Sequence, residues 1–255
     1  METFYTIMFF IIGTVFGSFY NVVGLRIPNK ENLIKPGSHC PRCGHELKWY
    51  ELIPIISFLC LGGKCKNCKE KISSLYPLNE FFSGILFALS YHSWGFSLDL
   101  AISLILCSFL IIVIASDLSY MIIPDSFIIV PSILIVLVKL IQVGPIETLK
   151  SIGYGLLAFG VMYLIMKLGN LIFKKESLGG ADIKLMFLSG LILGPMLSLV
   201  VIVIASLFAL PPSIYLYFKN KETIIPFGPF LVIGILLLFF SKLNFQEFLN
   251  LFIKF

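Results

Sequence analysis

Long apolar stretches separated by short polar segments dominate this chain, and their lengths suit helices that cross a bilayer, which need about 20 mainly apolar residues. The sixth stretch is short, Pro211-Pro212 interrupts the seventh, and Gly194-Pro195 predicts a tight turn between them. The pattern predicts an all-α polytopic membrane protein with about eight transmembrane helices, or seven if 183–218 forms one re-entrant element. The eight stretches are 3–25, 76–93, 99–117, 125–143, 148–172, 183–193, 195–218 and 224–241.

Composition agrees with this pattern. The 255 residues are 58% hydrophobic and 13% charged, whereas soluble domains are typically about 25% charged. Lipid is therefore expected to solvate most of the surface. The first stretch follows an acidic start, Met1-Glu2-Thr3, whereas a secretory signal begins with basic residues. We therefore expect a retained helix and not a cleaved signal peptide.

Positive charge gathers in one polar loop, residues 26–75. Nine of the 19 Lys and Arg residues lie between Arg26 and Lys71, interleaved with four glutamates. No aromatic and basic stripe of the kind that stacks bases is present, so no nucleic acid partner is expected. Basic residues favour the cytoplasmic side of a membrane, which predicts a cytoplasmic loop and an N-terminus outside. Other basic residues expected inside are Lys174, Lys175, Lys184, Lys219 and Lys221.

The loop contains two Cys-x-x-Cys pairs, Cys40 with Cys43 and Cys65 with Cys68, separated by 21 residues. Two such turns can place four thiolates around one tetrahedral Zn²⁺ ion. A cytoplasmic location keeps thiols reduced, which favours metal over disulfide. Free cysteines or a redox pair are the alternatives. Four protein ligands would close the site, so this ion is expected to hold the loop together and not to catalyse.

Other cysteines and histidines have simpler expected roles. Cys60 and Cys107 lie in apolar stretches and are expected to be small core residues. His39 and His45 flank the first cysteine pair, and either could replace a ligand. The histidines accompany no G-x-S-x-G elbow, and the sequence has no H-E-x-x-H motif, P-loop or G-x-G-x-x-G fingerprint.

Two aspartates are candidates for acid–base chemistry. Asp117 closes the third apolar stretch, and Asp182 opens the sixth after Gly179-Gly180-Ala181. The predicted topology puts both at the cytoplasmic boundary, where paired carboxylates can share one proton. Taken singly, each could instead be a carboxylate at a helix end. Asp125 is expected to cap the fourth stretch, and Asp99 is expected to be structural.

These motifs, taken in order, resemble the prepilin peptidase family, also called type IV leader peptidases, which are aspartyl proteases of the GxGD type. The resemblance covers most of the chain, from about Gly17 to Phe230. Two positions depart from the family pattern: Ala181 replaces a glycine before Asp182, and Leu75 stands where arginine is frequent. The matching segments are Gly17–Pro28, the two cysteine pairs, Leu47–Pro54, Ile72–Glu80, Asp117 with Ile123-Pro124-Asp125, and Asp182–Leu185.

The resemblance implies a multi-pass enzyme of the bacterial inner membrane that cleaves the leader peptides of type IV prepilins and related pseudopilins. Asp117 and Asp182 would be its catalytic pair. It also implies N-methylation of the new N-terminal residue with S-adenosyl-L-methionine. The expected parts are a first transmembrane helix (1–25), a zinc-ribbon-like domain associated with methyl transfer (26–75), a transmembrane peptidase domain (76–241) and an amphipathic tail (242–255).

Two alternatives remain open at this point. The first is a peptidase without methyltransferase activity, since the sequence has no recognisable site for a methyl donor. The second is a zinc-ribbon membrane adaptor or a transporter, whose aspartates would line an ion pathway. The Gly-rich approach to Asp182 favours an enzyme.

Overall fold

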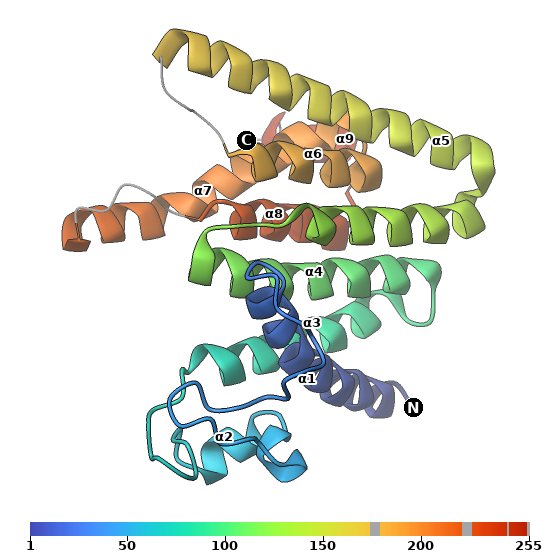
Figure 1. Cartoon of the computed structure of the whole chain (residues 1–255). Coiled ribbons are helices and arrows are strands. Elements are labelled where there is room, and N and C mark those ends of the chain that lie inside the picture. The colour runs from blue at the N-terminus through green and yellow to red at the C-terminus, as the bar shows by residue number, and fades with distance from the viewer. Residues whose placement is uncertain (174–178, 221–225, 244, 254–255) are drawn as a thin grey trace. The chain divides into compact units, whose positions relative to one another are not determined.

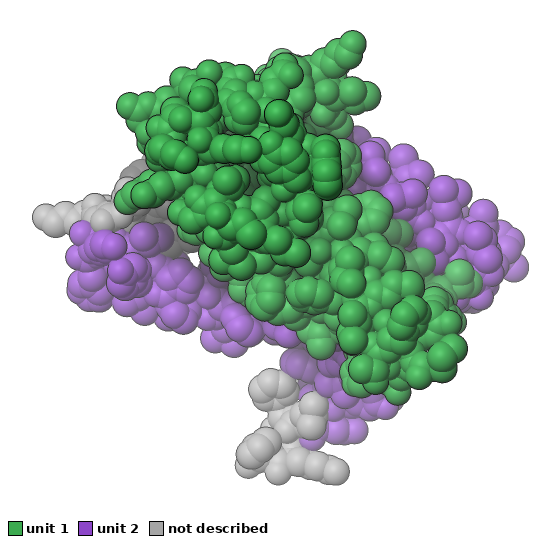
Figure 2. Space-filling model, turned by 90° about the horizontal axis from the view of Figure 1, so that it is seen from below, with its two compact units in different colours: residues 1–120 green, residues 121–255 purple. Residues whose placement is uncertain are grey.

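The computed structural model describes residues 1–173, 179–220, 226–243 and 245–253, and helices make up most of them. The chain forms two compact units, Met1–Tyr120 and Met121–Phe255, which Figure 2 colours separately. The predicted inside residues Lys174, Lys175 and Lys221 lie outside the described residues.

The first unit consists of three long helices and a cysteine-containing loop (Figure 1). Small and polar residues join the long helices α1 and α3, as is typical where apolar packing has no hydrophobic driving force. A Cβ added at Gly17 would lie 2.8 Å from Cα of Glu80, and Asn79 Nδ2 donates to Asn21 Oδ1 at 2.7 Å. The elements are α1 (Glu2–Arg26), the 3₁₀ helix η1 (Trp49–Leu52), α2 (Ile56–Cys60), α3 (Leu75–Trp94) and α4 (Leu98–Tyr120).

The second unit is built around a 49-residue helical element, α5, in which the chain reverses direction (Figure 1). The reversal occurs at Gly144, whose φ of 80° and ψ of 174° are not helical. This break separates two of the apolar stretches recognised in the sequence. The elements are α5 (Asp125–Phe173), α6 (Gly180–Leu193), α7 (Pro195–Asn220), α8 (Gly228–Ser241) and α9 (Phe245–Ile253).

Helix α6 packs closely against the second half of α5. A Cβ added at Gly190 would lie 2.6 Å from the Tyr154 carbonyl oxygen and 2.9 Å from Cα of Gly155. Near the other side of the break, Lys139 Nζ donates to the Leu191 carbonyl oxygen at 2.7 Å. A lysine at a helix C-terminus stabilises the carbonyl groups there. Both halves of α5 therefore hold α6 in place.

Four of the described helices, α1, α4, α5 and α7, are long and apolar enough to cross a membrane, and α8 is a shorter apolar helix. The predicted turn at Gly194 is confirmed, because its φ is 82° and it separates α6 from α7. The predicted interruption at Pro211-Pro212 is wrong, because α7 continues through both prolines. The Ser213 hydroxyl donates to the Ala209 carbonyl oxygen there, one way in which a proline-containing helix is stabilised.

Candidate functional site

The two cysteine pairs form matching turns in the loop of the first unit. In each turn the first cysteine's backbone N–H donates to the residue five positions on, Cys40 to His45 and Cys65 to Glu70. In each turn the residue after the second cysteine has a positive φ, 70° at Gly44 and 58° at Lys69. The two segments therefore adopt one backbone conformation, which directs both thiols of each pair to the same side.

These turns bring the four predicted cysteine ligands together. All four sulfur atoms lie within 4.8 Å of one another, with Cys40 Sγ 3.7 Å from Cys68 Sγ and Cys43 Sγ 3.9 Å from Cys65 Sγ. Disulfide sulfurs would be about 2.05 Å apart, and the cysteines are free thiols. The arrangement is close enough to bind one metal ion.

Backbone N–H groups prepare part of this cluster for ionisation. The Cys43 and Arg42 backbone groups lower the pKa of the Cys40 thiol to about 6, and the His45 backbone group lowers the pKa of Cys43. The Glu70 backbone group also lowers the pKa of Cys68, but desolvation and the neighbouring thiols outweigh it and raise that pKa to about 11. Without a cation, four adjacent thiols cannot all ionise readily.

Neither histidine beside the first pair joins the cluster. His45 Nε2 lies 3.2 Å from Glu51 Oε2, and His39 Nδ1 bonds the Gly37 carbonyl oxygen. Of the two cysteines predicted as core residues, Cys107 is fully buried, as expected. The prediction for Cys60 is wrong, because Cys60 is exposed: it lies on the outward face of the short helix α2.

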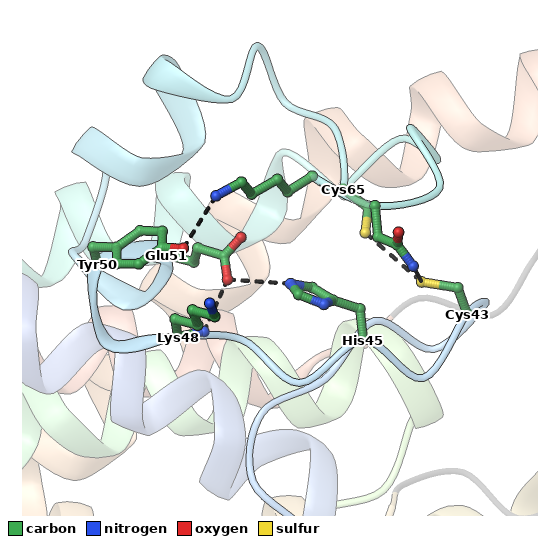
Figure 3. A network of polar contacts seen from close by, with 8 residues as sticks. Cys43, His45, Lys48, Tyr50, Glu51 and Cys65 are labelled. Atoms are coloured by element: carbon green, nitrogen blue, oxygen red, sulfur yellow. Dashed lines mark hydrogen bonds and ion pairs between the residues drawn. The ribbon is translucent and has the colours of Figure 1, made fainter.

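Glu51 is the centre of a polar network beside the cluster (Figure 3). Its Oε2 accepts from the Lys48 backbone N–H at 2.9 Å and lies near His45. Its side chain is only 1% exposed. The Lys48 N–H, followed by His45 and Lys66, lowers the pKa of Glu51. This carboxylate ties the first cysteine turn to η1.

Asp117 lies in the last turn of α4, three residues before the helix ends at Tyr120, and its side chain is buried. An ionisable side chain is expensive inside an apolar helix, and such residues are usually functional. The structure therefore places Asp117 at a helix end, as the sequence predicted, in the first compact unit.

Asp182 lies in the first turn of α6 and is also buried. Gly179 leaves room for it, because a Cβ at position 179 would lie 3.1 Å from Asp182 Oδ2. A Cβ at Gly180 would meet nothing within 4 Å. Ala181 lies inside α6 and is not among the residues with positive φ. The alanine that departs from the GxGD pattern is therefore compatible with the backbone.

The other two aspartates occupy helix starts. Asp125 begins α5 and forms an ion pair with Lys184 of α6, which joins the starts of these two helices. Both side chains are substantially exposed, so the pair contributes little to stability. Asp99 lies in the first turn of α4.

Three residues have contacts that the sequence reasoning missed. Arg26, interpreted as a topology signal, donates to four loop carbonyl oxygens. Glu80 in α3 accepts from the Ile55 backbone N–H at 2.8 Å, and Lys139 binds the end of α6. For Arg26 and Glu80, the available signal was their position in the motifs that carry the family resemblance. For Lys139 the only available signal was a lysine within the apolar stretch 125–143.

The fold and the site together define a class of protein. It is a helical membrane protein with a four-cysteine cluster and with buried aspartates at two helix ends. Two family models match the chain: the bacterial peptidase A24 N-terminal domain over residues 11–94, and the type IV leader peptidase family over residues 104–214. No solved structure matches it significantly.

Curated relatives are similar over most of the chain. The prepilin leader peptidase/N-methyltransferase of Bacillus subtilis is 39% identical over 185 residues, 72% of each chain. That of Pseudomonas aeruginosa is 32% identical over 252 residues, 88% of this chain and 86% of the relative. That of Myxococcus xanthus is 35% identical over 70% of this chain, and the match spans about half of the relative, 53%. The chain belongs to the type IV leader peptidase family.

Proposed function

We propose that this chain is a bifunctional prepilin leader peptidase and N-methyltransferase, with Asp117 and Asp182 as the peptidase's catalytic pair. The main support is the similarity to enzymes of that name, which extends over 86% of the Pseudomonas aeruginosa relative. Two buried aspartates at helix ends also support the proposal, because an aspartyl protease needs a pair of carboxyl groups. The substrates would be type IV prepilins and related pseudopilins.

In the proposed reaction, the ionised member of the aspartate pair removes a proton from water. The protonated member donates a hydrogen bond to the carbonyl oxygen of the scissile peptide and polarises it. Water oxygen bonds to that carbonyl carbon, and the resulting intermediate breaks its C–N bond as the amine nitrogen takes up the proton that the first aspartate removed from water. The products are the free leader and a mature protein with a new N-terminal amine. The space beside Gly179 keeps the Asp182 carboxylate unobstructed.

The four cysteines fit a structural zinc ion. Zn–S bonds of about 2.3 Å in a tetrahedron place sulfur atoms about 3.8 Å apart, close to the distances of 3.7 and 3.9 Å in the cluster. Cys40, Cys43, Cys65 and Cys68 would complete its coordination and hold the loop folded. S-adenosyl-L-methionine would supply the methyl group for the new amine. The proposal of that cofactor rests on the relatives' names, and we assign no residues to it.

We also propose a multi-pass location in the bacterial inner membrane. Eight crossings result if α1, α4, α7 and both halves of α5 cross the bilayer together with the helices α3, α6 and α8. The basic loop of residues 26–75 and both aspartates would face the cytoplasm, with the N-terminus outside. Lys184 and Lys219, at the ends of α6 and α7 that this topology places inside, fit that orientation.

Conservative substitution tests the aspartate pair. Asp117→Asn and Asp182→Asn each keep the side chain's shape and remove its acid–base function, so each is expected to abolish prepilin cleavage in reconstituted vesicles. Asp99→Asn is the matched control, with the same change at the start of α4, and is expected to cleave normally. Substantial cleavage by either of the first two variants would contradict the assignment.

A separate measurement decides between the bifunctional enzyme and a peptidase alone. Mature pilin produced in the presence of S-adenosyl-L-methionine is analysed by mass spectrometry. We expect the mass of one added methyl group at its N-terminus. A correctly cleaved but unmethylated product would support the peptidase without methyl transfer.

A further inference from the structure

One part of the loop has a surface that is unusual for a domain facing water. Residues 49–63, here called the apolar loop segment, contain a single charged residue, Glu51, and are flanked by Lys48 and Lys64. The Glu51 carboxylate is turned inward onto His45 and the Lys48 backbone (Figure 3), which leaves its side chain 1% exposed. The outward surface of this segment is therefore uncharged.

Large apolar side chains cover that surface. In η1, Trp49 is 78% and Leu52 41% exposed; in α2, Ile56 is 59% and Leu59 69% exposed. The two residues of each pair are three positions apart and therefore lie on the same face of their helix. Exposed Cys60 extends the face of α2. Runs of about 10–14 apolar residues are typical of buried or interfacial segments, and tryptophan is enriched at membrane interfaces.

A hydrogen bond fixes the depth of this segment. The Ile55 backbone N–H, at its middle, donates to Glu80 Oε2 at 2.8 Å. Glu80 lies five residues into α3, which corresponds to about 7.5 Å along the helix axis. It also lies against Gly17, well inside α1, one of the helices long and apolar enough to cross a bilayer. The segment is therefore attached within the helices, beyond the level at which α1 ends and α3 begins.

Charge around the segment identifies its partner. Nine Lys and Arg residues against four Glu residues lie between Arg26 and Lys71, and Lys48, Lys64 and Lys66 near the segment are exposed. These lysines give the segment a basic rim, and basic residues at a membrane surface attract its anionic headgroups. The rim would repel a prepilin leader, which the family resemblance implies is short and basic, so lipid is favoured over substrate as the occupant of this face.

We propose that the apolar loop segment docks into the headgroup and upper acyl region of the leaflet at which α1 ends and α3 begins. Trp49, Ile56 and Leu59 enter lipid, and the flanking lysines bind anionic headgroups. Interfacial helices typically enter the bilayer by about 5–10 Å, in keeping with the depth set by Glu80. This inference rests on the proposed membrane insertion of α1 and α3 and is independent of the proteolytic activity.

Tryptophan fluorescence tests this docking in the full chain. The chain has two tryptophans, so Trp94→Phe leaves Trp49 as the only one. The variant is reconstituted into phosphatidylcholine–phosphatidylglycerol vesicles with or without phosphatidylcholine brominated on the upper acyl chain. We expect the brominated lipid to quench most of the Trp49 emission and aqueous iodide to quench little. Efficient iodide quenching without quenching by the brominated lipid would overturn the proposal.

Matched variants in the Trp94→Phe chain separate docking from general exposure. Leu59→Glu introduces a charge on the docking face and is expected to weaken lipid quenching of Trp49 and to increase iodide quenching. Ile34→Glu makes the same change at a residue that is 80% exposed but lies outside the segment, and is expected to alter neither. Equal effects of the two substitutions would contradict a specific docking face.

Addition of a prepilin distinguishes the competing occupant and the proposed enzyme. If Trp49 is open to iodide in vesicles and becomes shielded only when prepilin is added, the face belongs to the substrate and the lipid proposal is wrong. Cleavage assayed in the same vesicles reports on the proposed function separately. Lipid quenching without cleavage would refute the enzyme assignment and leave the docking intact.

Discussion

Gly179 and Gly180 are adjacent in sequence but have different surroundings. A methyl group at position 179 would crowd Asp182 Oδ2 at 3.1 Å, whereas one at position 180 would be in open space. Because small displacements of a reacting group are costly in catalysis, we expect Gly179→Ala to lower the cleavage kcat by about tenfold. Gly180→Ala is the control and should change it by less than about twofold. Equal losses measured with a prepilin substrate would refute this role for Gly179.

Gly44 and Lys69 occupy equivalent positions in the two cysteine turns, with φ of 70° and 58°. A residue with a Cβ is strained in this region, so we expect Gly44→Ala to destabilise the loop by about 1 kcal/mol. Lys69→Gly should have the opposite effect, because it relieves the same strain in the second turn. The rate at which a competing chelator removes metal from the cluster measures the effect of each substitution. Faster metal loss from Lys69→Gly would show that the lysine side chain matters more than the backbone.

At the scale of helices, the close approach of α5 and α6 determines where Asp182 lies. A Cβ at Gly190 would meet backbone atoms of Tyr154 and Gly155 that cannot easily move, so Gly190→Ala is expected to cost about 2 kcal/mol. Gly160→Ala, also in a helix but with open space around it, should be neutral or stabilising by up to about 1 kcal/mol. The midpoint temperature of thermal unfolding in detergent is measured for both variants. A midpoint of Gly190→Ala equal to that of the wild type would contradict tight packing of α5 against α6.

Helix boundaries were predictable from the sequence because apolar stretches and helix-breaking residues are local signals. The first stretch was expected at 3–25 and the helix runs from Glu2 to Arg26, and the break at Gly194 was expected from Gly-Pro. The persistence of α7 through Pro211-Pro212 was not, because a side-chain hydrogen bond such as that from Ser213 to the Ala209 carbonyl oxygen can stabilise a helix against the local signal of its prolines.

Contacts between distant residues were predictable only where spacing encodes them. The four cysteines were expected together because two Cys-x-x-Cys turns have a known geometry. The bond between Ile55 and Glu80 joins residues 25 positions apart, and nothing in their spacing indicates it. The inward turn of Glu51 likewise depends on the path of the loop. The family resemblance identified the motifs that contain Glu51 and Glu80, but it did not indicate which residues these two contact.

At the scale of the whole molecule, the cysteine loop and the aspartates are expected to have separable functions. Cys40→Ser removes one of four clustered sulfurs and should release about one equivalent of zinc, because structural sites need all four ligands. Cys60→Ser is the control, since this exposed thiol lies outside the cluster, and should retain the metal. Elemental analysis measures the metal content. An unchanged zinc content in Cys40→Ser would contradict the four-thiolate site.

The same pair of variants reports on methyl transfer. Loss of the metal is expected to reduce N-methylation more than leader cleavage, because the loop is the part that the family resemblance associates with methyl transfer. Mass spectrometry of the pilin N-terminus gives both activities in one measurement. Parallel losses of cleavage and methylation in Cys40→Ser would show that the loop supports the whole enzyme.

Helices α6 and α8 are each only 14 residues long, which corresponds to about 21 Å, whereas the hydrocarbon core of a bilayer is about 30 Å thick. A crossing made by so short a helix requires local thinning of the surrounding lipid. Asp182 lies at one end of α6, so its position relative to the headgroups depends on this adjustment. If α6 crosses the bilayer as proposed, lipid chain length, a property of the host membrane, becomes a determinant of how the proposed catalytic carboxylate meets its substrate.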